Sequence, residues 1–276
     1  MNRPRTILGW TVTGGAITAA IIAVIALALF GLYQFRDTPG ARSVDDAVDE
    51  FRANSPADLG VVAVGLPPAG VYSATAQGQS SINFPPASQS WGQTLPVTIT
   101  HLGGDCWTLA IDFNTAYRQT WTQCVVDGEL LERGSVTVTR WDFGITTVSN
   151  TATYECEPAG VLIPRAQSIG SASTYTCEGT TDTVDGTTTS EATYEFVSIE
   201  MIPIENSDVE TYHFIQSEIL TGAQRGTTKT DYWFSTSDFL LIRMSRNLEI
   251  HTDSPVGDVV LLESGSAQLA SITPIR

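Results

Sequence analysis

The chain begins with a long apolar segment that carries no charge. Residues 7–33 read ILGWTVTGGAITAAIIAVIALALFGLY, and residues 16–32 are the most continuously apolar part. About 20 apolar residues in a helix span the hydrocarbon core of a bilayer. Trp10 and Tyr33 lie near the two ends, where amphipathic rings favour the headgroup level. The pattern predicts a transmembrane signal anchor over 7–33, with residues 1–6 left as a cytoplasmic tail.

A cleaved signal peptide is the alternative for this segment. Ala26-Leu27-Ala28 has the small-x-small spacing of a signal-peptidase site, but the apolar run continues past it through Leu29, Phe30 and Leu32. Arginines lie on both sides of the segment, so the positive-inside rule leaves the orientation nearly balanced. The cysteines and the large acidic part that follow favour a single-pass protein of the plasma membrane, with its C-terminal domain outside the cytoplasm.

Residues 34–70 predict a juxtamembrane helix and a linker. Ser43 with Asp46 three residues later is typical of a helix N-terminus, and apolar residues at helical spacing follow, which predicts a short helix over 43–53. The pattern leaves open whether this helix packs on a domain or forms a stalk. Proline and glycine residues disfavour a helix after it and leave room for a short strand at 61–64.

From residue 71 onward the pattern changes to β structure. Alternating or β-branched runs recur up to twelve times, and no helical periodicity of useful length occurs among them. A length of about 200 residues with this many strands predicts one large antiparallel, extracytoplasmic β domain over 71–276. The fold class is therefore mainly β, with an N-terminal transmembrane helix, a short juxtamembrane helix, and a half-barrel or a sandwich.

The alternation is clearest at 239–251. Ile242 and Met244 fall on one face of the predicted strand, and Arg243 falls on the other. Arg246 interrupts the apolar face. This is the pattern of a half-buried antiparallel strand.

A Thr-rich stretch precedes that strand in the chain. Asp185-Gly186 stands between two Thr-rich runs and predicts a two-residue hairpin turn, because a type I′ turn needs positive φ at both positions. The hydroxyls of residues 171–193 are expected to face water, with an adhesive or glycosylated strip as the alternative.

Four cysteines predict two disulfides in an exported domain, with three pairings open. A hairpin centred on Thr115 would place Cys106 opposite Cys124, within bonding reach, which leaves Cys156 to pair with Cys177. An immunoglobulin-like pairing of Cys106 with Cys177 is the alternative. The CxxC and HxxxH spacings of zinc sites are absent, so we expect no metal.

Charge excludes one class of partner. The sequence holds 30 acidic and 14 basic residues, a net charge of −16, and a surface of this kind repels nucleic acid phosphates. Lysine occurs once, at Lys229, against 13 arginines, a usage that fits a GC-rich genome such as that of an actinobacterium.

No sequence motif identifies an enzyme. The GxSxG, HExxH, Walker and dinucleotide patterns are absent, so we predict no catalytic residue and no cofactor. His251 lies near Asp253 and Ser254, but sequence neighbours rarely converge into a triad. His213 and His101 are expected to be a sheet-surface residue and a turn residue.

Two further groups of residues have a structural and a functional interpretation. An acidic group lacks the EF-hand spacing of a calcium site and is expected to be a solvated loop: Glu178, Asp182, Asp185 and Glu191. Four tryptophans in predicted strands either pack in the sheet or line a carbohydrate or lipid cleft: Trp107, Trp121, Trp141 and Trp233.

One hairpin carries a resemblance to a known family. The segments DYWFS at 231–235 and FLLIR at 239–243 resemble the corresponding hairpin of half-barrel proteins of the LolA/LppX type, in which Phe239 stands where that family usually has Gly. The chain also resembles exported or membrane-anchored actinobacterial proteins. The resemblance implies a curved sheet that wraps around apolar ligands, often lipids, with Trp233, Ile242 and Met244 on the concave side and no catalytic residue.

These observations favour a non-catalytic, membrane-anchored extracytoplasmic domain that binds a lipid or another apolar ligand, or that scaffolds an envelope complex. An adhesion or partner-binding sandwich is the alternative, and an envelope hydrolase with an acid pair is a third. The expected partners are the membrane, through residues 7–33, and a lipid or an envelope protein. The sequence leaves the ligand-binding residues unknown.

Overall fold

The computed structural model describes residues 38–54, 65–144, 146–254 and 257–276. The predicted tail over 1–6, the anchor over 7–33 and the short strand at 61–64 lie outside these residues. Within the described ranges, no helix is both long enough and apolar enough to cross a membrane. The chain divides into two compact units, and the fold below belongs to the unit formed by Pro39–Trp141 and Val148–Arg276.

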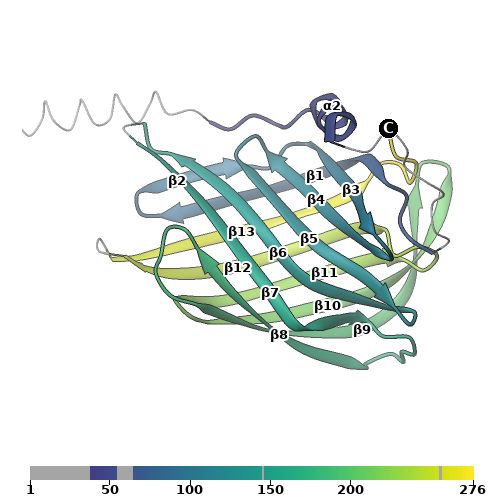
Figure 1. Cartoon of the computed structure of the whole chain (residues 1–276). Helices are drawn as coiled ribbons and strands as arrows, with labels where there is room; N and C mark the ends of the chain where they lie inside the picture. The colour runs from purple at the N-terminus through teal and green to yellow at the C-terminus, as the bar shows by residue number, and fades with distance from the viewer. Residues whose placement is uncertain (1–37, 55–64, 145, 255–256) are drawn as a thin grey trace, which may run out of the picture. The chain divides into compact units, whose positions relative to one another are not determined.

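The β domain is a closed antiparallel barrel (Figure 1). The barrel is closed by the pairing of the first strand with the thirteenth over Ala74–Ile82, so neither of these strands has a free edge along this stretch. β2 and β3 both pair with β1 in one continuous register and occupy one position in the wall, which gives a 12-strand barrel. The prediction of a mainly β domain is confirmed, and the half-barrel and the sandwich are wrong.

The strands are β1 Gly70–Asn83, β2 Pro86–Ser90, β3 Thr94–Gly103, β4 Cys106–Asn114, β5 Tyr117–Val126, β6 Glu129–Asp142, β7 Thr147–Ile163, β8 Ala172–Thr181, β9 Thr188–Ile204, β10 Ser207–Gly222, β11 Gln224–Ser235, β12 Leu241–Ser254 and β13 Gly257–Leu269.

Turn chemistry decides how consecutive strands connect. Asp127-Gly128 joins β5 to β6 with φ values of 54° and 82°, as a type I′ turn requires. The turn predicted at Asp185-Gly186 is wrong, because residues 182–187 separate β8 from β9 and only Gly186 among them has a positive φ.

The N-terminus of α2 (Val44–Asn54) is capped as predicted. The Ser43 Oγ accepts hydrogen bonds from the backbone amides of Asp45 and Asp46 at 3.1 and 3.4 Å. These bonds satisfy two amide groups that have no partner inside the helix. The helix predicted over 43–53 is confirmed.

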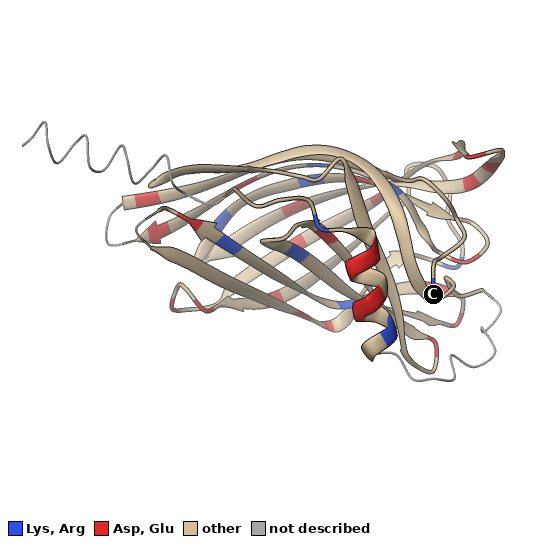
Figure 2. Cartoon of the chain, turned by 90° about the horizontal axis from the view of Figure 1, so that it is seen from above, with Lys and Arg blue, Asp and Glu red and all other residues tan. Residues whose placement is uncertain are grey.

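α2 packs on the outside of the barrel wall (Figures 1 and 2). Glu50 of this helix accepts a hydrogen bond from Arg118 of β5 at 3.0 Å. The helix is therefore a part of the domain and not a free stalk. Its buried residues Ala47, Val48 and Phe51 form a small apolar cluster with Ala69, which precedes β1, and with Val71 of β1.

Both predicted disulfides are present, and each joins neighbouring strands. Cys106 is bonded to Cys124 across the β4–β5 hairpin, where the two residues pair directly. Cys156 of β7 is bonded to Cys177 of β8. The immunoglobulin-like pairing of Cys106 with Cys177 is therefore wrong.

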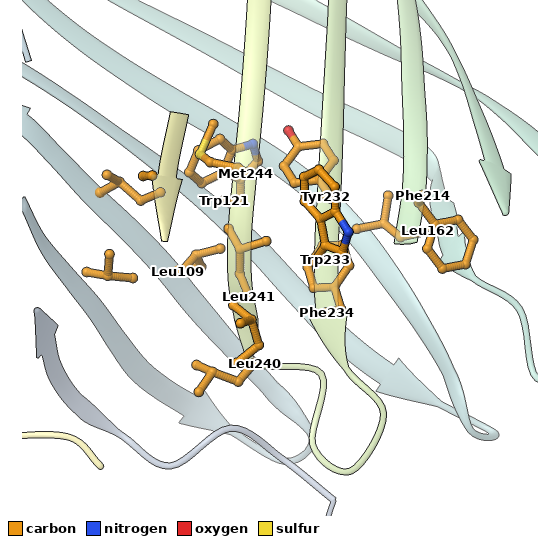
Figure 3. Close-up of a cluster of buried hydrophobic side chains, with 14 of the residues drawn as sticks. Leu109, Trp121, Leu162, Phe214, Tyr232, Trp233, Phe234, Leu240, Leu241 and Met244 are labelled. Carbon is orange, nitrogen blue, oxygen red and sulfur yellow. The ribbon is translucent and has the colours of Figure 1, made fainter. Parts of the chain in front are cut away.

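The interior of the barrel has two halves of different composition. One is an apolar core that includes Leu109, Leu162, Phe214, Phe234 and Leu240 (Figure 3), and we call it the packed half. Along β10, the buried Phe214 of this half is followed inside the barrel by Gln216 and Glu218. Along β11, Phe234 gives way in the same direction to Thr230 and Thr228, which pair with β10 at the same level. The large side chains of the packed half include Trp107, Phe113, Leu162, Ile163, Phe214 and Phe234.

Candidate ligand cavity inside the barrel

The other half of the interior contains a cavity of about 150 Å³, and we call it the polar half. The walls come from strands on all sides of the barrel. Polar side chains form the deeper wall, among them Glu132, Arg246 and Glu263. The lining becomes apolar along two strands: Leu220 follows Glu218 on β10, and Leu248 and Ile250 follow Arg246 on β12. Other strands continue the lining with polar residues, among them Thr137, Thr139 and Gln224.

Arg246 and Glu263 form a buried ion pair in the cavity wall. Their nearest nitrogen and oxygen atoms lie 2.5 Å apart, and the two side chains are 5% and 1% exposed. Arg246 also donates to the Tyr117 hydroxyl at 2.9 Å and to Gln119 at 2.6 Å, and Ser80 donates to Glu263 at 2.6 Å. The two terminal nitrogens of the arginine that interrupts the apolar pattern of β12 are therefore held by side chains of the barrel, while its Nε has no hydrogen-bond partner among the described residues.

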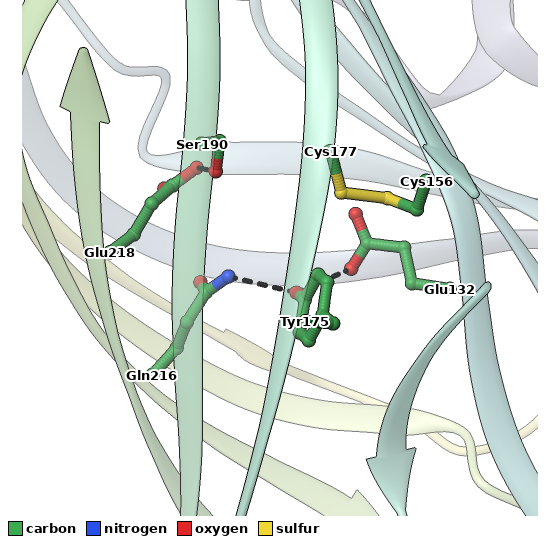
Figure 4. The surroundings of a disulfide bond; sticks show 7 residues. All are labelled: Glu132, Cys156, Tyr175, Cys177, Ser190, Gln216 and Glu218. Carbon is green, nitrogen blue, oxygen red and sulfur yellow. Dashed lines mark hydrogen bonds between the residues drawn. A yellow bond between two sulfur atoms is a disulfide. The ribbon is translucent and has the colours of Figure 1, made fainter. Parts of the chain in front are cut away.

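A second polar network crosses the cavity beside the Cys156–Cys177 disulfide (Figure 4). The Tyr175 hydroxyl donates to Glu132 at 3.3 Å and accepts from the Gln216 amide at 3.2 Å. The Tyr232 hydroxyl donates to the Gln216 carbonyl at 3.4 Å. Glu218 accepts a short hydrogen bond from Ser190.

The two carboxyl groups of this network differ from Glu263 in having no ion pair within the described residues. Burial, followed by the charge of Glu218, raises the pKa of Glu132 to about 8, against the hydrogen bond from Tyr175, which lowers it. Burial also raises the pKa of Glu218, against the hydrogen bonds from Ser190 and Thr228 and the charge of Arg246. The cavity therefore holds more carboxyl groups than cations.

The tyrosines around these carboxyl groups remain protonated donors. Burial raises the pKa of Tyr154 to about 12, and raises those of Tyr175, Tyr194 and Tyr232 above the usual tyrosine range. The rings of Tyr154, Tyr175 and Tyr232 line the cavity, and Tyr194 stacks on Tyr232 with centroids 5.7 Å apart.

The four tryptophans separate into three environments. Trp121 and Trp141 line the cavity, as the cleft interpretation required. Trp107 is 1% exposed in the packed half. Trp233 lies on the other face of β11, because its neighbour Tyr232 points into the cavity and side chains alternate along a strand.

Trp233 is the centre of a stack across three strands. Its register partners are His213 on β10 and Arg243 on β12. The His213 ring stacks on it at 4.2 Å, the Arg243 guanidinium lies 4.7 Å from its centroid, and its Nε1 donates to Glu200 at 2.8 Å. The expectation that Trp233 shares a concave face with Ile242 and Met244 is therefore wrong, while Arg243 does lie on the face opposite Met244.

The histidines lie outside the cavity lining. Both ring nitrogens of His213 bind carboxylates, at 3.0 Å from Glu200 and 2.9 Å from Asp231, so neither is free to accept a proton from a nucleophile. His251 binds Asp258 and Glu249, and Asp253 pairs instead with Arg225. His101 binds the Pro67 carbonyl oxygen at 2.9 Å.

The acidic group around residues 178–191 is not brought together as a metal site. Across the described ranges, no three His, Cys, Asp or Glu side chains are arranged to hold a metal ion. Asp182 instead accepts a hydrogen bond from the Thr151 amide at 2.7 Å.

The sequence analysis missed Glu132 and Glu218, the two residues that give the cavity its charge. The available signal was alternation: Glu132 follows the buried Leu130 at a spacing of two, and Glu218 stands between Gln216 and Leu220. An acidic residue in step with an inward-facing set is expected to lie inside the barrel.

The comparisons with known proteins gave no relative. No protein-family model, no curated protein and no solved structure matches the chain.

Proposed function

We propose that the protein is a membrane-anchored extracytoplasmic binding protein whose barrel holds a small amphipathic ligand. The observation that carries this proposal is the contrast inside the barrel. The packed half is filled, whereas the polar half encloses about 150 Å³ between unbalanced carboxyl groups and aromatic rings. Ligand sites combine an apolar wall with a few polar groups that fix orientation.

The volume limits the part of a ligand that enters. A cavity of about 150 Å³ accommodates a molecule about the size of benzene. A complete lipid with two acyl chains is larger than this, so a lipid ligand would place its head or a short chain inside.

The topology proposal rests on the disulfides and on the apolar sequence over 7–33. Two cross-strand disulfides are typical of domains that fold in an oxidising compartment. An anchor at 7–33 with the barrel outside the cytoplasm would meet this condition. The outer face is available for an envelope partner, which is the scaffolding alternative.

A hydrolase is a second candidate because the cavity contains two carboxyl groups with raised pKa values, Glu132 and Glu218. Such pairs serve as acid and base in several hydrolases. Binding is favoured because the cavity lining includes no histidine, and each carboxyl group already accepts a hydrogen bond from the barrel.

The test uses the full chain in lipid nanodiscs, since detergent could occupy the cavity. Organic extracts are analysed by mass spectrometry for molecules that co-purify. Thr137→Phe places a ring in the cavity, and Val138→Phe places the same ring on the exposed outer face of β6. A molecule retained by the wild type and by Val138→Phe but lost from Thr137→Phe supports the proposal. Equal retention by both variants contradicts it.

A further inference from the structure

The cavity wall holds a carboxyl group with one hydrogen bond and an amide nitrogen with none among the described residues. Glu132 is 8% exposed and accepts one hydrogen bond from the described residues, that of the Tyr175 hydroxyl. The amide nitrogen of Gln89, a residue that is 2% exposed, has no hydrogen-bond partner among them. Both side chains line the cavity. A buried polar group without a partner is costly, so a guest with complementary groups is favoured there.

Charge decides the sign of that guest. The one arginine in the lining, Arg246, is already paired with Glu263, which leaves Glu132 and Glu218 as two carboxyl groups without a cation. The rings of Tyr154, Tyr175 and Tyr232 also face this space, and aromatic faces attract cations. An anionic guest would be repelled by the same groups.

We infer, on the basis of the proposed function, that the ligand carries an amine, held as an ammonium ion by Glu132 and Glu218, together with a hydrogen-bond acceptor for the Gln89 amide. Carboxylates and aromatic rings together are suited to an organic cation. Uptake of the ammonium ion stabilises the ionised form of Glu132, so binding releases a proton from this carboxyl group to the solvent.

The titratable and charged groups around Glu132 determine how this release depends on pH. Tyr175 on β8, Tyr194 on β9, Glu218 on β10 and Tyr232 on β11 interact with Glu132 directly. The other titratable or charged groups of the cavity lining are Tyr117 on β5, Tyr154 on β7, Arg246 on β12 and Glu263 on β13. Burial raises the pKa of each of these tyrosines, so they keep their protons near neutral pH. Because the pKa of Glu132 is about 8, amine affinity should rise by up to tenfold per pH unit from pH 6 to pH 8.

The experiment compares probes of equal size on the full chain in nanodiscs. Calorimetric titrations use 3-amino-1-propanol, which has an amine and an acceptor, n-butylamine, which has the amine alone, and n-butanol, which is neutral. We expect the order of affinity to follow this sequence. Titration in two buffers of different ionisation enthalpy measures the released proton.

Glu132→Gln and Glu218→Gln keep the shape of the side chains and remove the charges. Each should lower amine affinity at least tenfold at pH 8, and Glu132→Gln should abolish the proton release. Glu155→Gln on the outer face of β7 is the matched control and should change neither quantity.

Two outcomes overturn the inference. Equal binding of n-butanol and the amines, unaffected by the two variants, leaves the cavity as a binding site but removes the cation. Failure of both amines to bind also overturns it, while co-purification of a neutral molecule would still support the proposed function.

Discussion

The two halves of the barrel interior are built on the same strands, yet one is filled by apolar side chains and the other encloses a polar cavity. In the packed half, Phe214 and Phe234 are 1% exposed among other apolar side chains. In the polar half, the same strands present Gln216, Glu218 and Thr228 to a cavity. The comparison shows that closure of a barrel does not require its whole interior to be filled: one half stabilises the fold, and the other can be specialised for a guest.

The largest expected effect comes from opening a void in the packed half. Phe214→Ala should lower the free energy of unfolding by about 3–5 kcal/mol, because the aromatic ring is fully buried and its neighbours cannot close the space. Thr137→Ala in the polar half should cost less than about 1 kcal/mol, since Thr137 borders an existing cavity. Urea denaturation of the two variants measures the difference, and equal costs would remove the distinction between the halves.

The buried acid provides the second test. The pKa of Glu132 rises from 4.5 to about 8 on folding, so the folded state holds this proton more tightly and its stability falls as pH rises from about 5 to 9. Glu132→Gln lacks this loss. The variant should match the wild type near pH 5 and exceed it by about 3–4 kcal/mol near pH 9. Parallel stability profiles over this pH range would mean that Glu132 is solvated.

The disulfides should separate stability from binding. Each closes a loop, with sequence separations of 18 and 21, so replacing either pair with serine should cost about 3 kcal/mol in the chain-entropy model. Cys177 lines the cavity, whereas Cys106 follows the β3–β4 turn. Loss of the Cys156–Cys177 bond should therefore also weaken ligand retention, and loss of the other bond should not. Mass spectrometry of bound ligand in the two double variants tests this contrast.

The smallest effect is expected on the outer surface. Arg243→Ala removes a guanidinium from the face of Trp233 and should cost less than about 1 kcal/mol, because the arginine is exposed. Chemical denaturation measures it, with Ser245→Ala on the same face of β12 as the control. A cost of several kcal/mol would show that the outer stack, and not only the packed half, holds the barrel together.

The sequence predicted the local features of this fold better than the global ones. Short-range patterns gave the capped helix at Ser43, the Cys106–Cys124 hairpin and the alternation of Ile242, Arg243 and Met244. Closure was not predictable in this way, because the pairing of Ala74 with Leu269 depends on how the twist of every strand between them accumulates.

The error on Trp233 concerned the β12 residue that it faces. Trp233 pairs with Arg243 in the same register that pairs Tyr232 with Met244, so its side chain shares the face of Arg243. The β11–β12 register shifts only after this pair, where Phe234 pairs with Leu241. The resemblance located the hairpin but could not supply its register. Phe239 in the same connection has φ of 59°, a left-handed value that Gly adopts more easily.

The candidate site was harder to predict than the fold. Trp121 and Trp141 could be proposed as lining residues because they are tryptophans in predicted strands. Glu132 and Glu218 could not be distinguished from surface acids, since 30 acidic residues occur in the chain. The presence of a charged residue in a strand does not show whether its side chain points inward or outward. Only the closed structure places these two side chains in one space.

The pairing of β1 with β13 sets the order in which the molecule can be completed. Every other strand pairs with one that is near it in the chain, so hairpins can form progressively as the polypeptide emerges. Until β13 docks, β1 and β12 expose unpaired backbone groups, and the carboxyl groups of the polar half remain open to water. When β13 pairs with β1 and β12, the unpaired strand edges are covered. The same step encloses Glu132 and excludes bulk solvent from it.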